Sequence, residues 1–278
     1  MAVEKKLSMS VDRFEDITDP LLHVGKSYQL GAAIRAGLPV PPGFGISCEA
    51  VEAVVRAEPA TCRSVVAALQ DLAADSVAVR SSAIGEDSSD ASFAGHHLSL
   101  MHLRSPEAIL DGIRQVWQSG CDPGALAYRH KKGIAGPVRI GVAVQAMVDA
   151  DCSGVLFSRH PVTGADEMVI EASWGLGEGV VSGLVIPDHY RVSRTGEIVE
   201  TRIGEKDVAI QLRVDGGTEE RPVEQARATV LCLSNDQIDD IRQLAIRCEA
   251  LFPQGLDIEW AYREGQLLLL QCRPISTK

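Results

Sequence analysis

The sequence predicts an α+β fold built from two subdomains. Segments with helical spacing and segments typical of strands are mixed without a regular βαβ rhythm, which indicates an α+β protein. The second half consists mainly of short Val-rich runs that favour strands. With 278 residues, of which 45% are hydrophobic, the chain can bury one large core or two moderate ones. We expect the subdomains to comprise residues 1–104 and 105–278.

The first half contains helices interrupted by a proline-rich segment. Residues 27–36 carry apolar side chains at helical spacing, and Gly37 ends this helix. The prolines within residues 38–44 exclude a helix, so an extended segment follows. The other elements expected in this half are helices over 49–57 and 61–72, a strand over 76–80, and a helix that begins at Ser105 and Pro106 and runs toward residue 118.

The second half contains strands, one long helix and a final hairpin. Ser234 is placed to cap a helix over residues 236–251, and Glu264 with Gly265 is placed to form the hairpin turn. Residues 210–224 are polar and Gly-rich, match no motif, and are expected to form a flexible loop. The strands expected in this half cover 138–148, 154–157, 167–170 and 190–192.

Composition argues against several classes of protein. A formal net charge of −11 disfavours nucleic acid or an anionic membrane as a partner. The seven cysteines never form a C-x-x-C pair, which disfavours a disulfide framework and a zinc site and indicates reduced, packed thiols. Residues 1–10 hold no signal-peptide core, and no apolar run approaches the roughly 20 residues that span a bilayer. We therefore expect a cytoplasmic protein.

The final hairpin carries side chains suited to a metal-bound polyphosphate. Side chains alternate between the faces of a strand, so Asp257 and Glu259 share one face of their strand, as Gln271 and Arg273 do on the next. Across a tight turn these four side chains can converge on one spot. Carboxylate and amide oxygens suit a hard cation, and a guanidinium suits phosphoryl oxygens. The alternative is a surface hairpin whose charges are solvated.

A first cationic candidate lies at the start of a helix, in Gly25-Lys26-Ser27. Backbone N–H groups and the helix dipole favour an anion at such a place, and Lys26 adds a positive charge. The segment is not a Walker loop, because Pro20 stands where that motif requires glycine. The alternative is an exposed lysine at a helix start.

A second cationic candidate is Arg80, which follows an apolar strand and precedes two serines, Ser81 and Ser82. An arginine beside two hydroxyl groups can hold a phosphate. The alternative is an ordinary salt bridge between Arg80 and Glu86 or Asp87.

Two Gly-bearing turns follow strands, in residues 153–161 and 174–179. Glycine lets backbone amides approach phosphates closely. The three glycines of the second turn resemble a dinucleotide-binding motif, but Gly183 and Pro187 break the helix that this motif requires. We therefore exclude a Rossmann site.

Six segments occur in an order that resembles one known family. They are Gly25-Lys26, residues 37–44, residues 79–83 with Glu86-Asp87 and 92–95, residues 154–157, residues 174–178, and residues 257–259 with 271–275. Together they are similar to the N-terminal nucleotide-binding domain of phosphoenolpyruvate synthase, pyruvate phosphate dikinase and rifampin phosphotransferase. The resemblance extends over nearly the whole chain and is specific to that domain, though not to one enzyme.

The resemblance implies an ATP-grasp fold, with ATP held between two α+β subdomains. It also implies roles for charged and polar residues. Lys26 and Arg80 would contact the phosphates, and Arg273 would stabilise charge on the transferring group. Glu259 and Gln271 would hold Mg²⁺.

The resemblance implies further contacts with the nucleotide. The hinge that meets adenine would include Gln145, Met147 and Val148, where backbone groups read the edge of the base and Met147 packs on the ring. The remaining implied contacts are Ser153 and Gly154, which with residues 159–161 would form a mobile loop over the phosphates, and Asp257 beside the metal ligands.

The acceptor of the phosphate is expected on another molecule. Members of the family carry a swivelling domain with a phosphorylated histidine in a Gly-Gly-x-x-Ser/Thr-x-His segment, and none of the seven histidines lies in such a context. His160 is the best placed of them, but it occupies an ordinary loop position. We expect an ATP-binding phosphotransferase that phosphorylates a histidine on a separate protein, which then passes the phosphate to a small-molecule acceptor. The alternatives are an ATP-grasp kinase or ligase that acts directly on a small acceptor, and a nucleotide-binding module without catalysis. The complete set of charged residues favours catalysis.

Overall fold

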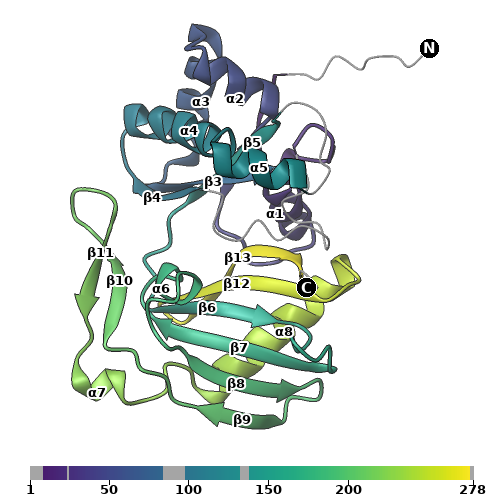
Figure 1. Ribbon diagram of the computed structural model, residues 1–278, viewed down its shortest axis with the longest axis vertical. Coiled ribbons are helices and arrows are strands. Elements are labelled where there is room, and N and C mark those ends of the chain that lie inside the picture. The colour runs from purple at the N-terminus through teal and green to yellow at the C-terminus, as the bar shows by residue number, and fades with distance from the viewer. Residues whose placement is uncertain (1–8, 24, 84–97, 132–137, 276–278) are drawn as a thin grey trace. The chain divides into compact units, whose positions relative to one another are not determined.

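The computed structural model describes residues 9–23, 25–83, 98–131 and 138–275 (Figure 1). Two segments that contribute to the family resemblance, Glu86-Asp87 and residues 92–95, lie outside these residues. The chain forms two compact units. Unit 1 comprises Met1–Ala32 and Pro42–Met147, and unit 2 comprises Ala33–Pro41 and Val148–Lys278.

The units divide the chain at a different place from the boundary expected at residues 104 and 105. That position lies between β4 (Ser99–Leu103) and α4 (Pro106–Gly120), which both belong to unit 1. The physical reason is the topology of the first sheet. The later strand β5 (Ile140–Ala146) lies between β2 (Gly43–Ile46) and β3 (Val77–Ala83), so this sheet is complete only at residue 146.

Unit 1 is an antiparallel sheet with three helices packed on one face. Its strands follow the order β1-β2-β5-β3-β4, where β1 is Val11–Arg13. Alternation places Val79 of β3 and Val144 of β5 on the face that α2 (Cys48–Val55), α3 (Pro59–Leu72) and α4 cover, and these elements share one apolar core (Figure 1). The other helical segments of unit 1 are η1 (Phe14–Asp16), α1 (Lys26–Arg35) and α5 (Pro123–Lys131).

The opposite face of this sheet is lined by small residues, and the start of α1 packs on it. A Cβ atom added at Gly45 would lie 2.9 Å from both the Cβ of Ser27 and the Nδ1 of His23. Glycine is therefore required at position 45 if α1 is to approach the strand this closely. We call this the small-residue face of unit 1. It includes Gly43, Gly45 and Ala143.

Unit 2 is a second antiparallel sheet, of six strands in the order β13-β12-β6-β7-β8-β9. Its core lies between the sheet and α8 (Asn235–Leu251), which contributes Ile241 and Leu244 against Trp260 and Tyr190 of the strands (Figure 1). The strands are β6 (Cys152–Phe157), β7 (Glu167–Trp174), β8 (Asp188–Ser193), β9 (Ile198–Arg202), β12 (Leu256–Arg263) and β13 (Gln266–Pro274).

Residues 210–224, expected as a flexible loop, contribute instead to a two-stranded hairpin of β10 (Val208–Leu212) and β11 (Thr218–Pro222). The physical reason is that apolar residues at every second position of β10 form a strand, and Gly216 and Gly217 supply the positive φ angles of the turn. The remaining short helices of unit 2 are α6 (Glu178–Val181) and α7 (Gln225–Ala228).

Several predictions from local sequence signals are confirmed. Ser105 accepts a hydrogen bond from the Ala108 N–H, and Ser234 forms a capping box with Gln237. Gly37 has a φ of 73° beyond the end of α1. The helix α6 has only four residues, which agrees with the exclusion of a Rossmann site.

All seven cysteines are free thiols, as expected, and burial raises the pKa of Cys48 to about 11 and that of Cys152 to about 12. Within the described residues, none of the helices has both the length and the apolar character needed to cross a membrane.

Candidate functional site

The terminal hairpin forms at the predicted turn. Glu264 and Gly265 have φ angles of 51° and 76°, the left-handed pair that a two-residue hairpin turn needs. The turn, together with a register shift between Glu259 and Trp260, places Asp257 opposite Arg273 and Glu259 opposite Gln271. The sequence prediction that these four residues come together on two adjacent strands is therefore confirmed.

A bulge in β13 completes this arrangement. Glu259 pairs with Gln271 and the next residue, Trp260, pairs with Leu269, so Leu270 is an additional residue. Because of the bulge, both Cys272 and Leu269 point into the core beneath α8 although they are three positions apart. The opposite face of the sheet then carries Asp257, Glu259, Gln271 and Arg273, and we call it the polar face of unit 2.

Asp257 and Arg273 form an ion pair on the polar face. The Nε and Nη2 atoms of Arg273 lie 3.0 and 2.9 Å from Oδ2 of Asp257. The side chains are 12% and 31% exposed for Asp257 and Arg273, respectively. Such charge-assisted contacts hold a guanidinium in one orientation, so Asp257 is placed to orient Arg273.

Glu259 and Gln271 are the two oxygen donors suited to a metal. Residues directly opposite in an antiparallel pair have Cβ atoms about 4.5–5.5 Å apart, so their side chains are near neighbours on the polar face. A carboxylate and an amide oxygen fit the preference of Mg²⁺ for hard donors. In the described part of the chain, no group of three or more His, Cys, Asp or Glu side chains could hold a metal ion. Magnesium usually takes several of its ligands from phosphate and water and needs only one or two from the protein.

The candidate residues of unit 1 share the small-residue face. Alternation from the core residue Val79 places Arg80 on that face, where it pairs with Ala143, and Gln145 lies on the same face of β5. The Ser27 N–H donates to Ser82 Oγ over 3.4 Å, which brings the start of α1, with Lys26, to the face of β3 that carries Arg80 two residues before Ser82. Lys26 and Arg80 are both buried.

Two backbone N–H groups of the hinge expected to meet adenine are already hydrogen bonded within the protein. The N–H groups of Ala146 and Met147 already donate to the carbonyl oxygens of Pro42 and Ser76, at 2.8 and 3.0 Å. These two N–H groups are therefore engaged in hydrogen bonds within unit 1. If the hinge reads the edge of a base, we expect it to use other groups, such as the N–H of Val148.

Ser153 and Gly154 have structural tasks in unit 2. The Ser153 hydroxyl donates to the carbonyl of Gly175 over 2.6 Å, and the Leu176 N–H donates to Ile210 in β10. Ser153 thus holds the Gly-rich turn 174–179. A Cβ atom at Gly154 would lie 1.9 Å from the carbonyl oxygen of Glu171, so glycine is needed for the close approach of β6 and β7.

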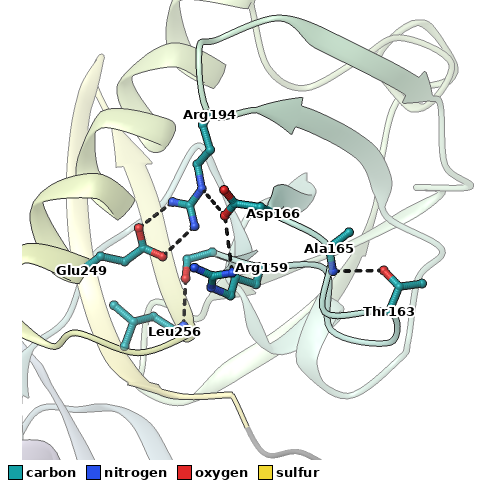
Figure 2. A network of polar contacts seen from close by, with 8 residues as sticks. Arg159, Thr163, Ala165, Asp166, Arg194, Glu249 and Leu256 are labelled. Atoms are coloured by element: carbon teal, nitrogen blue, oxygen red, sulfur yellow. Dashed lines mark hydrogen bonds and ion pairs between the residues drawn. The ribbon is translucent and has the colours of Figure 1, made fainter.

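The turn after β6, expected as a mobile loop, is held by several contacts. His160 Nδ1 accepts from the N–H groups of Val162 and Thr163, both at 3.3 Å, and the Gly164 N–H donates to the His160 carbonyl over 2.8 Å. Figure 2 shows Asp166 at the end of this turn in a network that involves Arg194 and Glu249. These contacts favour a fixed turn. They also employ the imidazole of His160 as a turn-stabilising acceptor.

Comparison with known proteins gives the family. Residues 58–278 match the pyruvate phosphate dikinase, AMP/ATP-binding domain. A probable phosphoenolpyruvate synthase of Methanothermobacter thermautotrophicus is 33% identical over 91% of this chain and 44% of its own length. The prodigiosin synthesizing transferase PigC of Serratia marcescens is 34% identical over 91% of this chain and 31% of its own length.

A rifampicin phosphotransferase of Streptomyces sviceus is 40% identical over 72% of this chain and 23% of its own length. The chain thus spans less than half the length of these curated relatives. The matched region includes Arg80, the Gly-rich turns and the terminal hairpin, which are segments that carried the sequence resemblance. The chain belongs to the pyruvate phosphate dikinase AMP/ATP-binding domain family, with the α+β, ATP-grasp architecture that the sequence predicts.

Proposed function

We propose that the protein is an ATP-dependent phosphotransferase that cleaves ATP and passes phosphate to a histidine on a separate protein, and from there to a small molecule. The main support is the paired register on the polar face, which sets an oriented guanidinium beside two oxygen donors suited to a metal. The names of the relatives, phosphoenolpyruvate synthase and rifampicin phosphotransferase, favour the same class of reaction.

Phosphoryl transfer depends mainly on positioning and charge neutralisation, which these residues can supply. In this proposal Lys26 and Arg80 bind phosphate oxygens, and Arg273 stabilises the charge that develops on the transferring group. Glu259 and Gln271 would hold Mg²⁺, which when bound neutralises phosphate charge and orients the chain of phosphates. Asp257 fixes the orientation of Arg273.

Further residues are proposed to contact or shape the surroundings of the rest of the nucleotide. Gln145, Met147 and Val148 contact adenine, while Ser153 and Gly154 act indirectly by shaping the Gly-rich turn and the strand beside it.

Three histidines of the described residues are held by structural contacts, which favours an acceptor elsewhere. His23 is buried and its Nε2 lies 2.7 Å from Asp12, while His102 Nδ1 lies 2.9 Å from Ser76 Oγ in a buried contact. His160 stabilises its own turn. These three side chains have structural partners, and a phosphorylated histidine needs an accessible ring nitrogen.

The first test measures ATP cleavage in the variants Lys26→Ala and Arg273→Ala. Removing one charge that stabilises the transition state lowers kcat by about a hundredfold or more. The control is Arg221→Gln, because Arg221 lies on β11, pairs with the carboxylate of Glu219 and has no proposed role toward ATP. Variants of Lys26 and Arg273 that retain full turnover would exclude the proposed site.

Glu259→Gln tests the metal. We expect the concentration of Mg²⁺ needed for half-maximal activity to rise about tenfold or more. An unchanged requirement would exclude Glu259 as a ligand.

A separate test identifies the acceptor. ATP labelled in its phosphates is incubated with the chain and Mg²⁺, with and without a candidate partner that contains a phosphorylatable histidine. Acid-labile label on the partner histidine is expected. Turnover of a small acceptor by this chain alone would indicate direct transfer, and ATP binding without any transfer would indicate a binding module.

A further inference from the structure

Arg159 follows β6 and lies at the end of the polar face, close to Asp257 and Arg273. In the register of β6 and β12, Phe157 is opposite Asp257, and Ser158 hydrogen bonds with Leu256, so Arg159 falls beside Gly255. A Cβ atom added at Gly255 would lie 3.6 Å from Cδ of Arg159. Residues 255, 257 and 259 project toward one face, so the stem of Arg159 crosses the polar face one row beyond the ion pair.

The partner of Arg159 is shared with another arginine. Nη1 of Arg159 lies 3.6 Å from Oδ1 of Asp166, beyond hydrogen-bond range, whereas Arg194 Nε lies 2.9 Å from the same oxygen (Figure 2). Arg194 also makes two bonds to Glu249, at 2.5 and 3.0 Å. Asp166 therefore interacts mainly with Arg194. Arg159, which is 50% exposed, makes the weakest contact in the network.

The main chain beneath Arg159 is fixed while its guanidinium can turn. Ser158 bonds to Leu256 through both its N–H and its hydroxyl, at 2.8 Å each, and the His160 N–H donates to Ala165 over 3.0 Å. Successive rows of the sheet are about 6.6 Å apart, a distance that an arginine side chain can span. Its head can therefore reach either Asp166 or an anion at the Arg273 end of the polar face.

The charges on the polar face call for another cation. Asp257 neutralises Arg273, and Glu259 adds a negative charge, so these three residues together carry a net charge of −1. This charge opposes a polyphosphate before Mg²⁺ is counted, so a further cation on this face would strengthen binding beyond what the metal supplies. Arg159 offers a positive charge from the adjacent row.

We propose that Arg159 is a further substrate-contacting residue, whose guanidinium leaves Asp166 and binds a phosphoryl oxygen of the nucleotide beside Arg273. This inference rests on the proposed function. The proposed contact is to the β- or γ-phosphate, which ATP carries and AMP lacks. Arg159 should therefore contribute to the binding of ATP and not to that of AMP.

The test is calorimetric titration of the intact chain with ATP and with AMP in the presence of Mg²⁺. Arg159→Gln should weaken ATP binding by about tenfold, the value of a lost charged hydrogen bond, and AMP binding by less than about twofold. Arg159→Lys keeps the charge and should fall between. The matched control is Arg221→Gln, since Arg221 is 51% exposed and also pairs with a surface carboxylate, and its affinities should not change.

A second variant separates the guanidinium from the structure of the turn. Asp166→Asn removes the competing carboxylate and should leave ATP affinity equal or higher. A loss like that of Arg159→Gln would attribute the effect to the turn and overturn the proposal, as would equal losses for ATP and AMP. Absence of ATP binding by the unmodified chain would overturn the proposed function as well, whereas normal ATP binding by Arg159→Gln would overturn the role of Arg159 alone.

Discussion

At the residue scale, the interior of unit 2 depends on one buried ion pair. Lys206 and Asp188 have fully buried side chains and are hydrogen bonded to each other. Asp188 also accepts the N–H groups of Gly204 and Cys232, both at 2.8 Å. A buried carboxylate with three donors is well satisfied, and removing its charge would leave Lys206 without compensation.

We expect Asp188→Asn to lower the free energy of unfolding by about 3–5 kcal/mol, because a buried charge is left without its counterion. Urea denaturation measures this loss. The double variant Asp188→Asn, Lys206→Met should recover part of it, since both charges are then absent. A loss below about 1 kcal/mol, in the range of a surface pair, would show that the pair is solvated.

His189 gives stability a predictable dependence on pH. Burial, followed by the nearby charge of Arg202, lowers the pKa of His189. The pKa of an unfolded histidine is about 6.5. Because the folded pKa is lower, the unfolded chain binds more protons than the folded chain as the pH falls through this value. The titration of His189 therefore leaves the free energy of unfolding unchanged at high pH and lowers it as the pH falls through about 6.5.

The variant His189→Gln should lose less stability than the unmodified chain when the pH is lowered from about 7.5 to 5.5. Urea midpoints at several pH values measure the difference. Parallel curves for the two proteins would mean that His189 titrates alike in both states.

At the element scale, the bulge at Leu270 determines how the polar face is built. Without it, Leu269 would share a face with Gln271, and an apolar side chain would leave the core. Bulges also increase the local twist and redirect neighbouring side chains. The bulge thus affects both the packing of β13 and the direction of Gln271.

Deleting Leu270 should produce a regular ladder, because Leu269 would then directly precede Gln271 with the correct alternation. We expect the fold to remain, with ATP cleavage reduced about tenfold by the altered direction of Gln271 and Arg273. Thermal denaturation and turnover assays measure the two effects. The control Leu270→Ala keeps the bulge and should retain activity. Equal activity in both variants would show that the bulge serves packing alone.

The same elements show what sequence can predict and what it cannot. The turn at Glu264 and Gly265 follows from turn chemistry, which is a local rule. The pairing of Asp257 with Arg273 also needs the bulge, because a regular ladder from this turn would place Cys272 opposite Asp257. The bulge does not follow, because four successive leucines at 267–270 provide no alternation to read. The hairpin β10–β11 also pairs with Gly175 through Ile210, a contact between residues distant in the sequence.

Some features of the candidate site also follow from local sequence rules, whereas others depend on tertiary contacts. The positions of Arg80 and Gln145 on one face follow from the period of a strand. The bond from Ser153 to Gly175 and the use of the Met147 N–H by Ser76 depend on tertiary contacts. No local pattern encodes them, and the roles of these residues toward the nucleotide stay predictions.

At the scale of the whole molecule, unit 2 is assembled from two separate stretches of chain. Ala33 and Leu38 are buried in its core, beside residues of α8 and the six-stranded sheet. The Leu269 N–H donates to the Pro39 carbonyl over 2.7 Å, and Arg247 donates to the Gly37 carbonyl over 2.7 Å. Residues 148–278 therefore lack part of their own core when they are separated from Ala33–Pro41.

We predict that a fragment of residues 148–278 is less stable than the same fragment with residues 33–41 joined through a flexible Gly/Ser linker. Burying Leu38 alone contributes about 1.5–3 kcal/mol, and the two backbone contacts add to it. Urea denaturation and binding of an apolar fluorescent dye measure the difference. A matched fusion with Leu38→Asp should behave like the shorter fragment, since a charge at that position cannot enter the core. Identical denaturation midpoints for the fragment and the fusion would mean that unit 2 folds without this segment, and that its buried position reflects the covalent connection of the chain and contributes little stability.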